Sequence, residues 1–376
     1  MTTKQNTQAG PDTEIRPFRI ETPQSELDDL AGRLDQVRWP DELPGAEWSY
    51  GVPLRFVKDL VAHWRDGYDW RAVEAKLNEY PQFTTTIDGQ NIHFLHVRSP
   101  EPDATPLILT HGWPGSIMEY VDVIEPLTNP EPGNPAFHLV IPSVPGFGFS
   151  GPTQEQGWNR HRIARAWAEL MRRLGYDRYG TAGNDLGSFV SPEVARIDPE
   201  HVIGVHVTQI FSFPSGDPAE FEGLSEHDQA AIEHMKWFWD TIGAYNMMHA
   251  QQPQTIAYGV MDSPVGLLGW NGQLFRDVDP DFILSNVMIY WLTRTAASAM
   301  RIYYEDDKAE HAKEPTEFPL GLASFGNDFT SIRRFAERDH KNIVSWHEYE
   351  AGGHYAAHQA PDVLVADIRE FFDSLR

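Results

Sequence analysis

The sequence contains no cysteine among its 376 residues. Disulfides, thiolate metal sites and a cysteine nucleophile are therefore excluded, and the composition gives no sign of an oxidising compartment. Runs of about 18 apolar residues, which a membrane-spanning helix needs, are also lacking. The first 14 residues have no apolar segment typical of a secretory signal. We expect residues 1–14 to be a disordered tail, and the protein to be cytoplasmic and not bound to membranes.

Basic residues are scarce, since 30 lysines and arginines stand against 55 aspartates and glutamates, for a formal net charge of −25. This charge repels phosphates and argues against nucleic acids and anionic membranes as partners. A neutral or cationic small molecule is the better expectation. The chain length suits one large α/β domain with an insertion or an extra arm.

Residues 15–82 have the pattern of a helical arm that is rich in tryptophan. Leucine and valine recur at helical spacing in residues 27–37 and again in residues 54–64. The arm cannot bury both apolar stripes by itself, so we expect it to wrap around a larger body. The tryptophans are interpreted as packing residues.

Residues 83–210 alternate between strand and helix patterns, beginning with a hairpin whose turn is Asp88-Gly89. This alternation predicts an α/β fold with a mainly parallel sheet and helices on both faces. Residues 211–317 lose the strand pattern, which resumes in residues 318–376. Because the interruption is too long for a loop, we expect a helical cap at 211–317, inserted between two strands of the core.

The stretch AGNDLGS resembles a nucleophile elbow, the strand-to-helix turn Gly-x-Ser-x-Gly of hydrolases, but with Asp185 in place of serine. Gly183 and Gly187 provide the small neighbours that such a strained turn needs. The amides at the start of the following helix favour a carboxylate at the tip. Taken alone, the motif is weak evidence, because an aspartate before a helix is more often a simple cap.

Two further residues complete a catalytic set in the order nucleophile, acid, histidine. His354 lies between the last strand and the last helix, and His358 on that helix is its nearest competitor. Asp328, which follows a strand, is the favoured acid. The alternatives for the acid are Asp339, Glu348 and Glu350.

The segment HGWPGS follows a buried strand and can offer a backbone amide to the same site. We expect the amides of Trp113 and Leu186 to form an oxyanion hole. Because proline is the residue before which a cis bond costs little, we also predict a cis bond between Trp113 and Pro114.

An aspartate nucleophile indicates attack on a saturated carbon. The product of that attack is an ester, which a histidine-activated water and an oxyanion hole can hydrolyse. The carbon must carry a leaving group, and a halide or a strained epoxide oxygen are the two candidates. The residues alone leave both open.

From about Arg16 onward the sequence resembles the microsomal-type epoxide hydrolases, on the motifs RPFRIETPQSELDDLAGRL, HGWPGS and GGHYAAHQAP. The resemblance implies an α/β-hydrolase fold, an epoxide substrate, a vicinal diol product, and no metal or organic cofactor. It also implies that two cap tyrosines bind the epoxide oxygen, and the matching positions are Tyr245 and Tyr303 rather than Tyr304. A leaving alkoxide is a strong base and needs such a proton donor.

The sequence departs from that family at the elbow, where Asn184 and Leu186 stand in place of glycine and tryptophan, and at Asp328, where many relatives carry glutamate. We expect Asn184 and Trp113 to line the substrate pocket. A haloalkane dehalogenase and a non-catalytic binding protein on a hydrolase scaffold remain the alternative functions. The sequence leaves a homodimer open as a partner, and leaves detoxification, catabolism and secondary metabolism open as roles.

Overall fold

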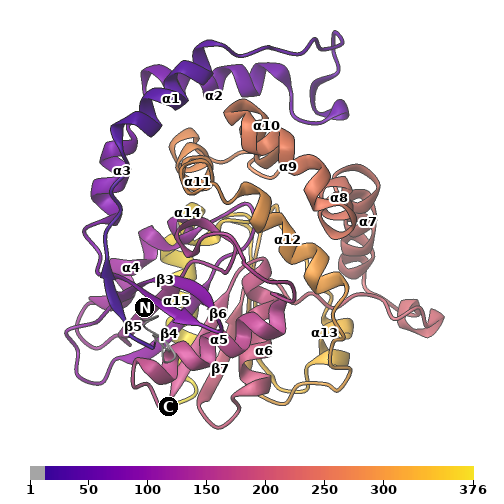
Figure 1. Cartoon of the computed structure of the whole chain (residues 1–376). Coiled ribbons are helices and arrows are strands. Elements are labelled where there is room, and N and C mark those ends of the chain that lie inside the picture. The colour runs from indigo at the N-terminus through magenta and orange to yellow at the C-terminus, as the bar shows by residue number, and fades with distance from the viewer. Residues whose placement is uncertain (1–12) are drawn as a thin grey trace, which may run out of the picture.

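The computed structural model describes residues 13–376 (Figure 1). Of the predicted disordered tail, residues 1–12 lie outside this range. None of the described helices is both long enough and apolar enough to cross a membrane.

Within residues 13–376, nine strands form one sheet in the order β1-β2-β3-β5-β4-β6-β7-β8-β9. Their bounds are β1 (Arg16–Phe18), β2 (Gln82–Ile87), β3 (Gln90–Val97), β4 (Thr105–Thr110), β5 (Phe137–Pro142), β6 (Tyr179–Gly183), β7 (Val202–Val207), β8 (Leu320–Phe325) and β9 (Ile343–Tyr349). The pairings among β4 to β9 are parallel, whereas β1, β2 and β3 pair antiparallel with their neighbours. The prediction of a mainly parallel sheet is confirmed.

The predicted hairpin joins β2 and β3. Its two turn residues, Asp88 and Gly89, have φ angles of 51° and 76°. Positive φ at both central residues is the geometry of a type I′ turn, whose twist matches that of the paired strands.

Helices cover both faces of the parallel part of the sheet. A Cβ at Gly180 of β6 would lie 2.4 Å from the ring of Phe372, whereas one at Gly183 would lie 2.3 Å from the backbone of Gly187. Residues 180 and 183 point to opposite faces of a strand. The C-terminal helix α15 (Pro361–Asp373) therefore covers one face and α6 (Leu186–Ile197) the other. On these faces, α4 (Val121–Thr128) packs with α15, and α5 (Arg160–Arg173) with α6.

The N-terminal arm contains α1 (Gln24–Asp35), α2 (Leu54–Asp66) and α3 (Trp70–Leu77). The expectation of a wholly helical arm is wrong at its start, because Arg16–Phe18 forms β1, which pairs with β2 at the edge of the sheet. The arm passes along the outside of the cap (Figure 1), and Trp64 of α2 donates a hydrogen bond from Nε1 to the sulfur of Met288 in the cap.

The cap stands between β7 and β8 and consists of helices, as Figure 1 shows. They are α7 (Glu226–Thr241), α8 (Ala244–Gln251), α9 (Pro253–Asp262), α10 (Pro264–Gly272), α11 (Pro280–Thr293) and α12 (Ala296–Asp307). The remaining helices are α13 (Arg333–Asp339) and α14 (Ala356–Gln359) in the core, and the short 3₁₀ helices Glu47–Tyr50 in the arm, Ile117–Tyr120 and Gly148–Ser150 in the core, and Pro218–Phe221 between β7 and α7.

Candidate active site

The elbow places Asp185 between β6 and α6 with φ 54° and ψ −117°. This is a strained conformation for a residue other than glycine, and such strain is typical of functional turns. A Cβ at Gly187 would lie 1.8 Å from the carbonyl oxygen of Thr110, so only glycine fits there. The strand and the helix can approach this closely because both flanking residues are glycine.

Two backbone amides hold the carboxylate of Asp185. The Trp113 amide donates to Oδ1 over 2.9 Å, and the amide of Leu186 lies within hydrogen-bonding reach of the same carboxylate. Gly112 makes room for this contact, since a Cβ there would lie 2.0 Å from Oδ1. The bond between Trp113 and Pro114 is cis, as predicted. The two amides expected to form the oxyanion hole therefore meet at Asp185.

His354 lies between two carboxylates. Its Nδ1 is 2.8 Å from Oδ1 of Asp328, in the turn after β8, and its Nε2 is 3.8 Å from Oδ2 of Asp185. The structure thus brings together the nucleophile, the histidine and the acid favoured from the sequence.

The competing residues lie elsewhere. Asp339 pairs with its neighbour Arg338, and Glu348 accepts a hydrogen bond from the indole of Trp346. His358 is held between Asp122 and Asp279 instead of facing Asp185.

The charges of this group affect one another. Desolvation lowers the pKa of His354, but the neighbouring carboxylates, Asp328 first and Asp185 next, outweigh it and raise that pKa to about 9. Desolvation raises the pKa of Asp185. For Asp328 the desolvation is outweighed by His354, so its pKa is lowered. The resting site therefore holds an imidazolium, with Asp328 as its ionised partner.

Tyr245 of α8 and Tyr303 of α12 meet at the ring of Trp113. The ring of Tyr245 stacks on that of Trp113 at 5.2 Å, and the ring of Tyr303 meets it edge-on at 6.1 Å. Burial raises the pKa of both phenols, which keeps them protonated as donors. Tyr304 is 40% exposed with Lys308 over its ring, so it lies outside this group.

Gln209 connects these parts and was missed from the sequence. Its Oε1 accepts from the amide of Asp185 and from the hydroxyl of Ser188, both over 2.9 Å. Its Nε2 donates to Asn184 and to Oδ2 of Asp328. Gln209 follows β7, where the sequence offers no carboxylate. Nothing local marks a glutamine as the residue that links the elbow to the acid.

The side chain of Asn184, which we expected to line the substrate pocket, is bound to residues that support the catalytic set. Its side chain donates to the carbonyl oxygen of His354 over 2.8 Å and accepts from Thr208 and Gln209 over 2.7 and 2.6 Å. Only 3% of the residue is exposed. Asn184 therefore joins the elbow to the loop that carries His354 and to the residues after β7.

Glu119 is a second residue that the sequence did not single out. It lies in the 3₁₀ helix after HGWPGS, is 1% exposed, and its Oε2 has no hydrogen-bond partner. Desolvation raises the pKa of Glu119 to about 8, although His354 opposes this. At neutral pH this carboxyl is mostly protonated, so it adds little negative charge beside His354.

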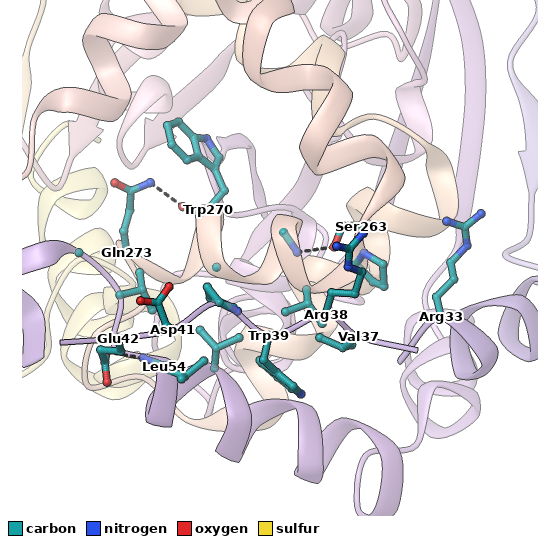
Figure 2. A pocket seen from close by; sticks show the side chains of 18 of the residues that line it. Arg33, Val37, Arg38, Trp39, Asp41, Glu42, Leu54, Ser263, Trp270 and Gln273 are labelled. Carbon is teal, nitrogen blue, oxygen red and sulfur yellow. Dashed lines mark hydrogen bonds between the residues drawn. The ribbon is translucent and has the colours of Figure 1, made fainter. Parts of the chain in front are cut away.

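A separate groove with a volume of about 1190 Å³ lies between the arm and the outer side of the cap. Figure 2 shows residues that line it, among them Trp39 and Glu42 from the arm and Ser263, Trp270 and Gln273 from the cap. None of the catalytic candidates lines it. Trp270 is nevertheless connected to the site, because its Nε1 donates to Nε2 of His249, which packs against Trp113. Among residues 13–376, no group of three or more histidines and carboxylates is arranged to hold a metal ion.

The chain is similar to known proteins both in sequence and in fold. Residues 15–120 match the model of the epoxide hydrolase N terminus, and residues 105–245 match that of the alpha/beta hydrolase fold. A protein of Stigmatella aurantiaca is 39% identical over 96% of this chain and 86% of its own length. Epoxide hydrolase 1 of Sus scrofa is 31% identical, over 98% of this chain and 90% of its own. The crystal structure of the juvenile hormone epoxide hydrolase from the silkworm Bombyx mori superposes with a TM-score of 0.91 at 26% identity, covering 97% of this chain and 96% of that one.

Proposed function

The chain belongs to the microsomal-type epoxide hydrolase family, and from this premise we propose that it converts an epoxide and water into a vicinal diol through an ester on Asp185. The observation that carries the proposal is that Trp113 contacts both the proposed nucleophile and the two proposed proton donors. Its amide binds the carboxylate of Asp185, while its ring packs against Tyr245 and Tyr303.

In the first step, Oδ2 of Asp185 attacks an epoxide carbon and the bond from that carbon to the ring oxygen breaks. Oδ1 is held by the Trp113 amide, which leaves Oδ2 as the free nucleophile. Tyr245 and Tyr303 donate to the departing oxygen, and one of them gives it a proton. General acid assistance of this kind is worth roughly 10²–10⁴ in rate.

Ester formation changes the charge beside His354. The Asp185 carboxylate contributes to the raised pKa of His354, and alkylation removes that negative charge. The pKa of His354 therefore falls, and its imidazolium releases a proton. This proton returns to the tyrosine that gave its own proton to the epoxide oxygen. The neutral histidine can then act as a base.

In the second step, His354 takes a proton from water, and the resulting hydroxide attacks Cγ of Asp185. The amides of Trp113 and Leu186 stabilise the oxyanion that forms. Collapse of this intermediate breaks the bond to the product oxygen, which takes the proton back from His354. Asp328 keeps Nδ1 of His354 protonated and correctly oriented throughout, over its 2.8 Å contact.

Trapping the ester tests this proposal. His354→Gln removes the base and keeps Asp185, so incubation with styrene oxide should leave a stable adduct on the peptide that contains Asp185, detected by mass spectrometry. His358→Gln is the matched control, because that histidine is held by Asp122 and Asp279, and it should turn over without accumulating ester. An adduct on another residue, or halide release from a haloalkane without epoxide turnover, would overturn the proposal.

We also propose the charge of the substrate and the cellular location of the reaction. A net charge of −25 favours an uncharged or cationic epoxide over a phosphorylated one, and the absence of cysteine fits the cytoplasm. A panel of styrene-type, aliphatic and polycyclic epoxides, together with cell fractionation, tests both points.

A further inference from the structure

His249 lies inside the aromatic group of the active site but takes no part in the steps above. It follows Tyr245 by four residues on α8, so both side chains project from the same face of that helix. The imidazole is fully buried, with its ring centre 4.6 Å from Trp113 and 4.9 Å from Tyr303. His249 therefore directly contacts residues that we propose to bind the substrate and the oxyanion.

The protonation of this ring is fixed by Trp270. An indole nitrogen can only donate, so Nε2 of His249 must accept the 2.9 Å hydrogen bond from Trp270 Nε1. Burial lowers the pKa of His249 to about 3, so the ring is neutral at physiological pH. A neutral imidazole whose Nε2 accepts carries its hydrogen on Nδ1.

The Nδ1–H group has no oxygen or nitrogen acceptor within the described residues. A buried donor left unsatisfied is costly. The neighbours of His249 on this side are aromatic rings. The rings of Trp113 and Tyr303 stand at 85° and 69° to the imidazole, which is the edge-to-face arrangement in which an N–H can point at a π face.

We propose that His249 is a positioning residue for epoxide opening, whose single N–H, directed by Trp270, is held against the π face of Trp113 or Tyr303. The inference rests on the proposed function, since it assigns a role in the alkylation step. An N–H on these rings restrains the two tyrosines above Trp113, so that their hydroxyls converge on the epoxide oxygen. The ester hydrolysis step does not use the tyrosines and should be unaffected.

Nuclear magnetic resonance tests the tautomer without any substrate. In full-length protein labelled with ¹⁵N-histidine, the His249 signals are identified by their loss in His249→Gln. We expect the Nδ1–H tautomer with no titration between pH 5 and 9, and a proton resonance shifted upfield by the ring current. Trp270→Phe should abolish this signature. An Nε2–H tautomer, or an N–H shift typical of a bond to water or oxygen, would overturn the proposal.

Single-turnover kinetics with styrene oxide test the role. His249→Leu should slow alkylation by roughly twofold to fivefold, the effect of one weak hydrogen bond, and leave ester hydrolysis unchanged. His249→Gln, which can accept from Trp270 and still donate, should restore most of the alkylation rate. Tyr258→Phe, on an exposed side chain of the neighbouring helix α9, is the control and should change neither rate.

The outcomes separate the two proposals. Equal slowing of both steps in His249→Leu would show a general structural role, and an unchanged alkylation rate would show no role; either result rejects the inference. If His249→Leu fails to fold, Trp270→Phe replaces it in the kinetics, since it removes only the group that fixes the tautomer. Absence of any ester in wild type or His354→Gln would reject the proposed function instead, while the resonance measurement still decides the tautomer.

Discussion

Oδ2 of Asp185 lies 3.8 Å from Nε2 of His354, within range of an ion pair but beyond a good hydrogen bond. This separation suits both steps of the proposed reaction. The carboxylate oxygen is not tied to the histidine and stays free to attack. Once it is alkylated, His354 stands beside the ester, where it can activate a water molecule.

The pH dependence of ester hydrolysis should reveal the change of charge at Asp185. In the resting enzyme the pKa of His354 is raised to about 9, partly by the Asp185 carboxylate. Because the ester is neutral, this pKa must fall in the intermediate, and the hydrolysis rate should rise with pH to a plateau reached below pH 9. Stopped-flow fluorescence in single turnovers measures it. A rate that keeps rising through pH 9 contradicts this prediction.

Removal of either cap tyrosine should affect only the first step. Tyr245→Phe and Tyr303→Phe each remove one donor to the epoxide oxygen, and we expect alkylation to slow on the order of 10²-fold with ester hydrolysis unchanged. Tyr304→Phe serves as the control, because that ring is exposed. Rapid-quench measurement of ester and diol separates the steps. If a variant with both substitutions forms the ester as fast as wild type, the tyrosines do not bind the leaving oxygen.

Gln209→Glu should shift the hydrolysis profile to higher pH. The substitution keeps the shape of the side chain but replaces the Nε2 donor to Asp328 with an oxygen. An added negative charge near His354 favours the imidazolium and raises its pKa. Less neutral histidine is then present at pH 7, so hydrolysis slows there. Gln156→Glu, at an exposed position, is the control. A profile identical to wild type would mean that Gln209 does not act on the histidine and acid pair.

Glu119→Gln should change how stability depends on pH. Because burial raises the pKa of Glu119 from 4.5 to about 8, the folded state holds this proton more tightly than the unfolded state. The protonated carboxyl therefore contributes to the free energy of unfolding, and this contribution is complete below pH 4.5. It is lost as the pH rises from 4.5 through 8, at about 1.4 kcal/mol per pH unit at most.

The glutamine variant lacks this loss, so its stability relative to wild type should increase between pH 5 and pH 8. Urea unfolding of both proteins at several pH values measures the difference, and Glu125→Gln on the exposed side of α4 is the control. A difference between Glu119→Gln and wild type that stays constant with pH would show that Glu119 is ionised like a surface carboxylate.

The sequence allowed prediction of the fold and of the charged residues of the site because each leaves a local pattern. The two glycines mark the elbow, and the positions of Asp328 and His354 after successive strands indicate that they meet at one edge of the sheet. The strand Arg16–Phe18 could not be predicted, because it has three residues, one of them proline, and depends on its pairing with β2.

The neutral residues around the catalytic set could not be predicted either. Gln209 and His249 acquire their roles from partners that are 119 and 21 positions away, Asp328 and Trp270. The partners of Asn184 were missed for the same reason. Its position next to Asp185 suggests a pocket residue, whereas its side chain forms hydrogen bonds with Thr208, Gln209 and the His354 carbonyl.

One single-turnover experiment in H₂¹⁸O tests the central claim most directly. With enzyme in excess over styrene oxide, the new diol oxygen should come from Oδ2 of Asp185 and contain ¹⁶O, while ¹⁸O should appear in the carboxylate of Asp185. Mass spectrometry of the diol and of the peptide reports both. If the first-turnover diol carries ¹⁸O and Asp185 remains unlabelled, water attacks the epoxide directly and the ester mechanism is wrong.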